Sequence, residues 1–131
     1  MANLAMQRNP AESYRRVAMD AAIFGSDARG LTRLCFDEFT QALSRASFAH
    51  RNDKSEMRGT SLVRALAALS GLRAGLDRGN SLAQAFDTVF SAADRTLRAS
   101  LVTFDMHSVQ NIHNDFLELR DVLTGAGEGS V

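Results

Sequence analysis

The residue types that most often carry chemistry are few in this chain. It has a single cysteine, Cys35, and three scattered histidines. Structural zinc sites need closely spaced Cys or His pairs, and di-iron sites in helical bundles need glutamates with a Glu-x-x-His pair. Neither pattern occurs in the sequence, nor does a glycine-rich phosphate loop that follows a strand. We therefore expect no metal, no cofactor and no enzymatic activity.

The histidines His107 and His113 leave a histidine phosphotransfer domain as an alternative function. A histidine phosphotransfer domain uses a solvent-facing histidine on a helical bundle, with a cation nearby to hold the phosphoryl oxygens. His113 is instead followed by Asn114 and Asp115, and His107 stands at a helix start, where solvated histidines are common. The sequence favours ordinary surface histidines, with phosphotransfer as the alternative. Cys35 falls on an apolar helix face, where cysteine usually behaves as a small hydrophobe.

Composition narrows the class of protein further. The 131 residues are 45% hydrophobic, which is enough for one core, and fifteen basic side chains balance fifteen acidic ones. A zero net charge without a basic stripe argues against nucleic-acid binding. The unpaired cysteine suits a reducing compartment, and charged residues interrupt the first thirty positions, so that we expect neither a signal peptide nor membrane insertion. The sequence predicts a cytoplasmic protein.

Apolar residues recur with helical spacing along almost the whole chain, and alternating strand patterns are absent from the sequence. Asp53 with Glu56 looks like a capping box, and Asn80 or Ser81 is a candidate N-cap. The prediction is an all-α, antiparallel four-helix bundle with short connections. Its parts are a mobile N-terminal arm over 1–12, a short helix over 13–24, long helices over 27–50, 54–76, 81–103 and 107–124, and a flexible tail over 125–131.

Each long helix has one apolar stripe that we expect to face the core. The predicted core positions are Leu31, Leu34, Cys35, Phe39, Ala42 and Ala46 in the first, Leu62, Leu66, Leu69 and Leu76 in the second, Leu82, Phe86, Val89, Phe90, Ala93, Leu97 and Leu101 in the third, and Val109, Ile112, Phe116, Leu119 and Leu123 in the fourth. Arg73 also falls on the second stripe, near its end.

A few large apolar residues lie off these stripes. The angular position of Phe36, about 100° from the middle of its stripe, places it on a flank of its helix. The other displaced residues are Val63, Leu117 and Val122. Single exposed apolar residues are common, but several around one core suggest outer apolar grooves in which partner helices dock.

The sequence resembles the flagellin-specific secretion chaperone family FliS over about 14–122. The family's Ala-Tyr pair in the N-terminal arm is similar to Ser13-Tyr14, and its first long helix carries a signature that resembles the segment from Leu31 to Asp37, with Phe36 in place of Tyr. Further similarities are Leu76-Asp77 with Gly79, Leu82-Ala83, Val89-Phe90 and Arg95-Thr96-Leu97. The chain departs from the family at Ala28, where Pro is usual, and near Val122, where a Trp is often found.

The resemblance implies a cytosolic export chaperone that binds the disordered C-terminal segment of flagellin and prevents premature polymerisation. It also implies delivery to an export gate protein of the flagellar type III apparatus, with the N-terminal arm involved. Tyr14 would match the family's arm tyrosine, with Val17 beside it. For flagellin, the off-stripe residues Phe36, Val63, Leu117 and Val122 are the candidate contacts. A helical adaptor or regulator for another secreted protein remains the main alternative.

Overall fold

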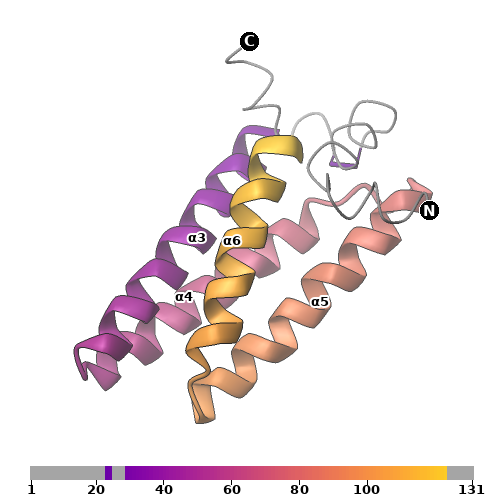
Figure 1. The fold of residues 1–131 in the computed structure, drawn as a ribbon. Coiled ribbons are helices and arrows are strands. Elements are labelled where there is room, and N and C mark those ends of the chain that lie inside the picture. Colours follow the sequence, from indigo (N-terminus) through magenta and orange to yellow (C-terminus); the bar gives the residue numbers. More distant parts are fainter. Residues whose placement is uncertain (1–22, 25–28, 124–131) are drawn as a thin grey trace, which may run out of the picture.

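The computed structural model describes residues 23–24 and 29–123. Four α-helices make up this part of the chain: α3 (Arg29–Arg51), α4 (Ser55–Ala74), α5 (Ser81–Val102) and α6 (Met106–Leu123). They run alternately up and down, and each packs against two others in the ring order α3, α4, α5, α6 (Figure 1). The predicted all-α four-helix bundle is confirmed, and each helix begins and ends within about two residues of the predicted bounds.

The short connections are built by local hydrogen bonds. Asn80 is the N-cap of α5, because its side-chain oxygen accepts a hydrogen bond of 2.8 Å from the Leu82 amide. Asp105 plays the same part before α6, where its carboxylate accepts from both the amide and the hydroxyl of Ser108. The capping box at the start of α4 is wrong. Asp53 has a positive φ of 54° and turns the chain, and the N-cap position falls to Lys54.

Ile23 and Phe24 correct the end of the predicted short helix. Phe24 forms an isolated β-bridge with Leu76, and the Asp77 amide donates to the Ile23 carbonyl at 2.8 Å. Ile23 is buried, and the Phe24 ring meets that of Phe36 edge-on with centroids 6.3 Å apart. These two residues are therefore extended and attached to the α4–α5 connection. The rest of the predicted helix over 13–24, the arm over 1–12 and the tail over 125–131 lie outside the described residues.

Aromatic rings fill the centre of the bundle. The Phe116 ring of α6 lies within ring-contact distance of Phe36 and Phe39 of α3 and of Phe90 of α5, with centroids 4.6–6.2 Å apart. All four side chains are buried. Contacts of this size are worth about 0.5–1.5 kcal/mol each beyond the area they bury. The cluster joins three of the four helices at one level of the bundle.

The predicted stripes of α3 and α5 are correct only in part: the structure buries Phe39, Ala42 and Ala46 of α3 and Phe86, Phe90, Ala93 and Leu97 of α5 as predicted. Leu31 and Leu34 of α3 are 63% and 55% exposed, whereas Thr32 and Phe36 are buried. In α5 the predicted core residues Leu82, Val89 and Leu101 are exposed. The predicted stripes of α4 and α6 are largely correct: Leu62, Leu66, Leu69 and Leu76 are buried, as are Val109, Phe116 and Leu119, while Ile112 and Leu123 are half-buried.

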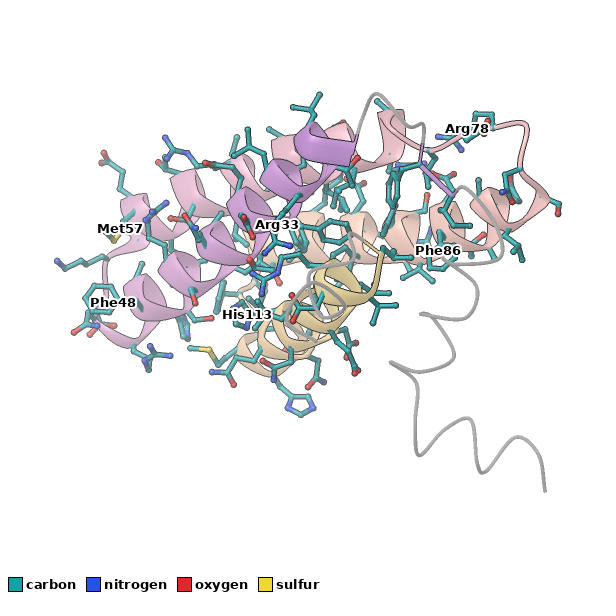
Figure 2. All side chains as sticks on the ribbon, turned by 90° about the horizontal axis from the view of Figure 1, so that it is seen from above. Arg33, Phe48, Met57, Arg78, Phe86 and His113 are labelled. Carbon is teal, nitrogen blue, oxygen red and sulfur yellow. The ribbon has the colours of Figure 1, made fainter. Side chains whose placement is uncertain are left out.

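Ion pairs and an aromatic stack connect neighbouring helices near both ends of the bundle. Near the α4–α5 connection, Arg73 and Arg78 both pair with Asp87, at 3.0 and 3.5 Å. Arg120 of α6 reaches Asp37 of α3 at 3.1 Å. At the opposite end His50 stacks on Phe104 with centroids 4.5 Å apart, and the same His50 ring accepts a 3.0 Å contact from Arg58. Figure 2 shows Arg78 and Phe86 at the first of these ends.

Candidate functional site

Phe36 and Val122 are not surface residues, so the interpretation that placed them on an outer groove is wrong. Both side chains are buried, Phe36 completely. In the structure Phe36 touches the rings of Phe24, Phe90 and Phe116. The neighbouring Asp37 forms the ion pair with Arg120. Within the signature-like segment of α3, Phe36 thus belongs to the core and Asp37 connects α3 to α6.

Of the remaining predicted contacts, Val63 and Leu117 lie in the described part of the chain. Val63 of α4 is 56% exposed, as an outer contact requires, and Leu117 of α6 is half-buried. Tyr14 and Val17 lie outside the described residues. The structure does not bring Val63 and Leu117 together, because α4 and α6 are not neighbours in the ring. A partner that touched both would have to extend around the bundle.

An exposed apolar stripe on α5 is the feature that sequence reasoning missed. Its members are exposed and lie on one side of the helix, with spacings of three, four, three and seven residues: Leu82, Ala85, Val89, Ala92 and Ala99. The core residues Phe86, Phe90, Ala93 and Leu97 lie on another side of the helix. The sequence signal was present, but Leu82 and Val89 were assigned to the core. We call this set the α5 stripe.

The direction of the α5 stripe follows from Asp87. That carboxylate points to α4, where it pairs with Arg73, and at 100° per residue the stripe lies on roughly the opposite flank of α5. This is the flank on the side of α6. Figure 1 shows α5 and α6 joined at one end and diverging toward the other, and this pair makes the least extensive contact among the neighbouring helices. The divergence leaves the stripe uncovered by the described residues.

A groove continues this surface at the α5–α6 connection. It has a volume of about 920 Å³ and is lined by residues that include Ala99, Val102, Phe104 and Met106. Val102 is 90% exposed, the highest value among the large apolar side chains of the described residues. Exposed apolar residues that lie close together on a surface often mark a site where another protein binds. The arrangement can bind an apolar helix face, and it offers little for covalent chemistry.

The candidate nucleophiles support that conclusion. Burial, with a smaller effect from the Glu38 carboxylate, raises the pKa of the Cys35 thiol, which disfavours the reactive thiolate. Both ring nitrogens of His113 have neighbours, Ser44 at 3.4 Å and Asn114 at 3.2 Å. His107 is exposed and its Nε2 lies 3.2 Å from Asn111. Among the described residues no group of three or more His, Cys, Asp or Glu could hold a metal.

The comparison with protein families decides the identity. The family model described as flagellar protein FliS matches residues 10–128. The chain belongs to the FliS family. A search of curated proteins finds no match. FliS membership supports a general role as a flagellar export chaperone and argues against an enzyme. In the described part of this FliS chain, no helix is long and apolar enough to cross a bilayer.

Proposed function

We propose that this FliS protein is a bacterial cytosolic chaperone that binds the C-terminal segment of flagellin on the α5 stripe. The observation that carries the proposal is the run of exposed apolar residues on α5 with helical spacing, beside the core face. Such a run is how grooved proteins recognise amphipathic helices. In this family the cargo is flagellin, whose free C-terminal segment must be kept from polymerising.

The side chains of the α5 stripe suit a helical ligand. Ala85, Ala92 and Ala99 are small, so a second helix can approach α5 closely. Val89 projects between Ala85 and Ala92, and Leu82 projects one turn before Ala85. Side chains of the ligand helix would then fit into the spaces between the projecting residues of α5, as in coiled coils. Each large apolar side chain buried at such a contact is worth about 1.5–3 kcal/mol.

Further contacts are required because a disordered segment loses conformational entropy when it folds on a surface. Val63 and Leu117 are the proposed additional contacts, which a ligand that wraps around the bundle would reach on α4 and α6. The α5–α6 groove offers a continuation of the stripe. A helical adaptor for another secreted protein would use the same surface, so the identity of the cargo needs a direct test.

The test compares two single substitutions on α5 by calorimetry with a C-terminal flagellin fragment from the host bacterium. Val89→Glu introduces a charge into the stripe, and we expect the Kd to rise at least tenfold, about 1.4 kcal/mol. The matched control is Gln84→Glu, an exposed position off the stripe that gains the same charge. Both variants should melt within a few degrees of the wild type. Equal binding by both variants would contradict the proposed surface, and a wild type that does not bind would favour another cargo.

Delivery to the export gate is the second part of the proposal. By resemblance, Tyr14 and Val17 contact the gate protein, and both would act after cargo binding. A Tyr14→Ala variant should bind the flagellin fragment normally, yet its complex should be retained less by the immobilised cytosolic domain of the gate protein. Unchanged retention would show that the gate recognises another part of the chaperone.

A further inference from the structure

A second surface lies on the opposite pair of helices. A groove of about 620 Å³ runs between the C-terminal half of α3 and the start of α4. Its lining combines three cations, Arg45, Lys54 and Arg64, with a single carboxylate, Glu56. The remaining lining residues are Ser55, Met57, Thr60 and Ser61. This surface is separate from the α5 stripe.

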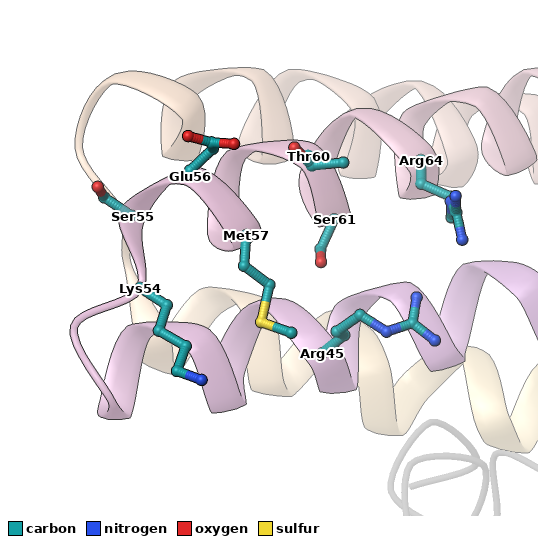
Figure 3. Close-up of a pocket in the computed structure, with 8 residues that line it drawn as sticks. All are labelled: Arg45, Lys54, Ser55, Glu56, Met57, Thr60, Ser61 and Arg64. Carbon is teal, nitrogen blue, oxygen red and sulfur yellow. The ribbon is translucent and has the colours of Figure 1, made fainter.

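The two arginines face each other across the groove. Figure 3 shows the guanidinium groups of Arg45, on α3, and Arg64, on α4, both directed into the space between the helices. Within the described residues neither forms a salt bridge, whereas Arg73, Arg78, Arg98 and Arg120 all do. Like charges held near each other repel, and a carboxylate placed between them would remove that repulsion.

Apolar side chains complete the surface. Met57 is 37% exposed, and Figure 3 shows its side chain extending across the groove between Lys54 and Arg45. Phe48, 45% exposed, projects from the same end of the bundle (Figure 2), with the Lys54 ammonium 5.8 Å from its ring centroid. Thioethers adapt to varied apolar partners. A ligand that fits therefore has an apolar side chain flanked by carboxylates.

We propose that this groove is a docking site for an acidic, amphipathic segment of a second protein. Charge complementarity selects the occupant: an excess of two cations in the lining favours an acidic ligand, and the apolar Met57 favours a peptide over a free anion. Nucleic acid would need a longer run of phosphate contacts than three cations supply. The site lies on α3 and α4, so a ligand helix on the α5 stripe would leave it accessible.

The experiment uses a synthetic acidic helical peptide in which Leu and Glu recur with helical spacing, and a copy with Lys in place of every Glu. Isotope-labelled FliS protein is titrated with each, with the Met57 methyl resonance as the local reporter. The acidic peptide should shift that resonance, and its Kd should rise at least tenfold in Arg45→Glu with Arg64→Glu. The matched control, Arg95→Glu with Arg98→Glu on α5, has the same net charge and should bind as the wild type does.

Several results would overturn the proposal. They are failure of the acidic peptide to bind, equal binding by the basic copy, or an equal loss in both double variants. Competition by inorganic phosphate at concentrations as low as those of the peptide would show a simple anion site instead. Should the double Glu variant melt early, Arg45→Gln with Arg64→Gln must show the same weakened binding. Flagellin binding should be unaffected by these substitutions, which separates this proposal from the proposed chaperone function.

Discussion

Helices α3 and α4 pack closely against each other, whereas α5 and α6 are held farther apart. A β-carbon added to Gly71 of α4 would lie 2.8 Å from the sulfur of Cys35 on α3, so these helices are as close as their side chains allow. Between α5 and α6 stand the rings of Phe90 and Phe116, with centroids 5.6 Å apart. Interhelical distance depends on the side chains at the contact. The small residues Gly71 and Cys35 therefore allow α3 and α4 to approach closely, and the rings of Phe90 and Phe116 keep α5 and α6 farther apart.

This difference explains where the two candidate surfaces lie. The α3–α4 pair makes the most extensive contact in the bundle and leaves only an outer groove, whose charged rim suits an acidic segment. The diverging α5–α6 pair leaves one flank of α5 uncovered by the described residues, which suits an apolar helix. One bundle thus offers two partners chemically distinct surfaces.

The largest expected effect comes from removing the aromatic spacer. Phe116→Ala deletes a buried ring that touches Phe36, Phe39 and Phe90, so we expect the free energy of unfolding to fall by about 3–5 kcal/mol. Chemical denaturation measures this directly. Val89→Ala, at an exposed position on α5, is the control and should change stability by less than about 0.5 kcal/mol. A loss below about 1 kcal/mol for Phe116→Ala would mean that the ring is not a central contact.

A smaller effect tests the close packing of α3 on α4. Gly71→Ala should gain about 1 kcal/mol of helix propensity but lose more through the clash with the Cys35 sulfur, giving a net destabilisation of about 1 kcal/mol. In a Cys35→Ala background the sulfur is gone, so the same substitution should stabilise the protein. A double-mutant cycle of unfolding free energies detects this change of sign. Additive effects would show that the two residues are not in contact.

The bundle could be predicted from sequence because it depends on spacing that many residues share. Helical periodicity and a few turn residues, such as Asn80, were enough to fix four helices within about two residues. The first turns of α3 were harder to predict. Its stripe of Leu31, Leu34 and Cys35 is apolar, but the structure buries Thr32 and Phe36 and exposes both leucines. At the start of α3 two neighbouring faces are almost equally apolar, so periodicity alone does not decide which of them is buried.

The candidate site was harder to predict for the same reason. The core face of α5 and the flank beside it both carry apolar residues, and only the positions of the neighbouring helices decide which of them is covered. Leu82 and Val89 were therefore assigned to the core, and Phe36 and Val122 to the surface. The α3–α4 groove was not predictable either, since Arg45 and Arg64 stand far apart in the sequence and meet only because the two helices are antiparallel.

The smallest predicted effect concerns the α4–α5 contact, which ion pairs between Asp87 and two arginines stabilise. The hydrogen bond from Arg73, helped by Arg78, holds the pKa of Asp87 below its ordinary value, although partial burial opposes this. A lowered pKa in the folded state means that the stabilisation is present above the ordinary aspartate pKa of about 3.9 and disappears as the pH falls through the lowered value.

Asp87→Asn should therefore cost about 0.5–1 kcal/mol at neutral pH, a modest value because Arg73 and Arg78 are partly exposed to solvent. The difference from the wild type should shrink as the pH falls below about 4, where the carboxylate of the unfolded chain takes up its proton, and should vanish below the lowered pKa of the folded protein. Urea denaturation over a series of pH values measures it. Asp94→Asn, which removes the surface pair with Arg98 on the same helix, is the matched control and should cost less than about 0.5 kcal/mol. If Asp87→Asn and Asp94→Asn were equivalent at neutral pH, the Arg73 pairing would contribute no more than an ordinary surface contact, and apolar packing alone would hold α4 to α5.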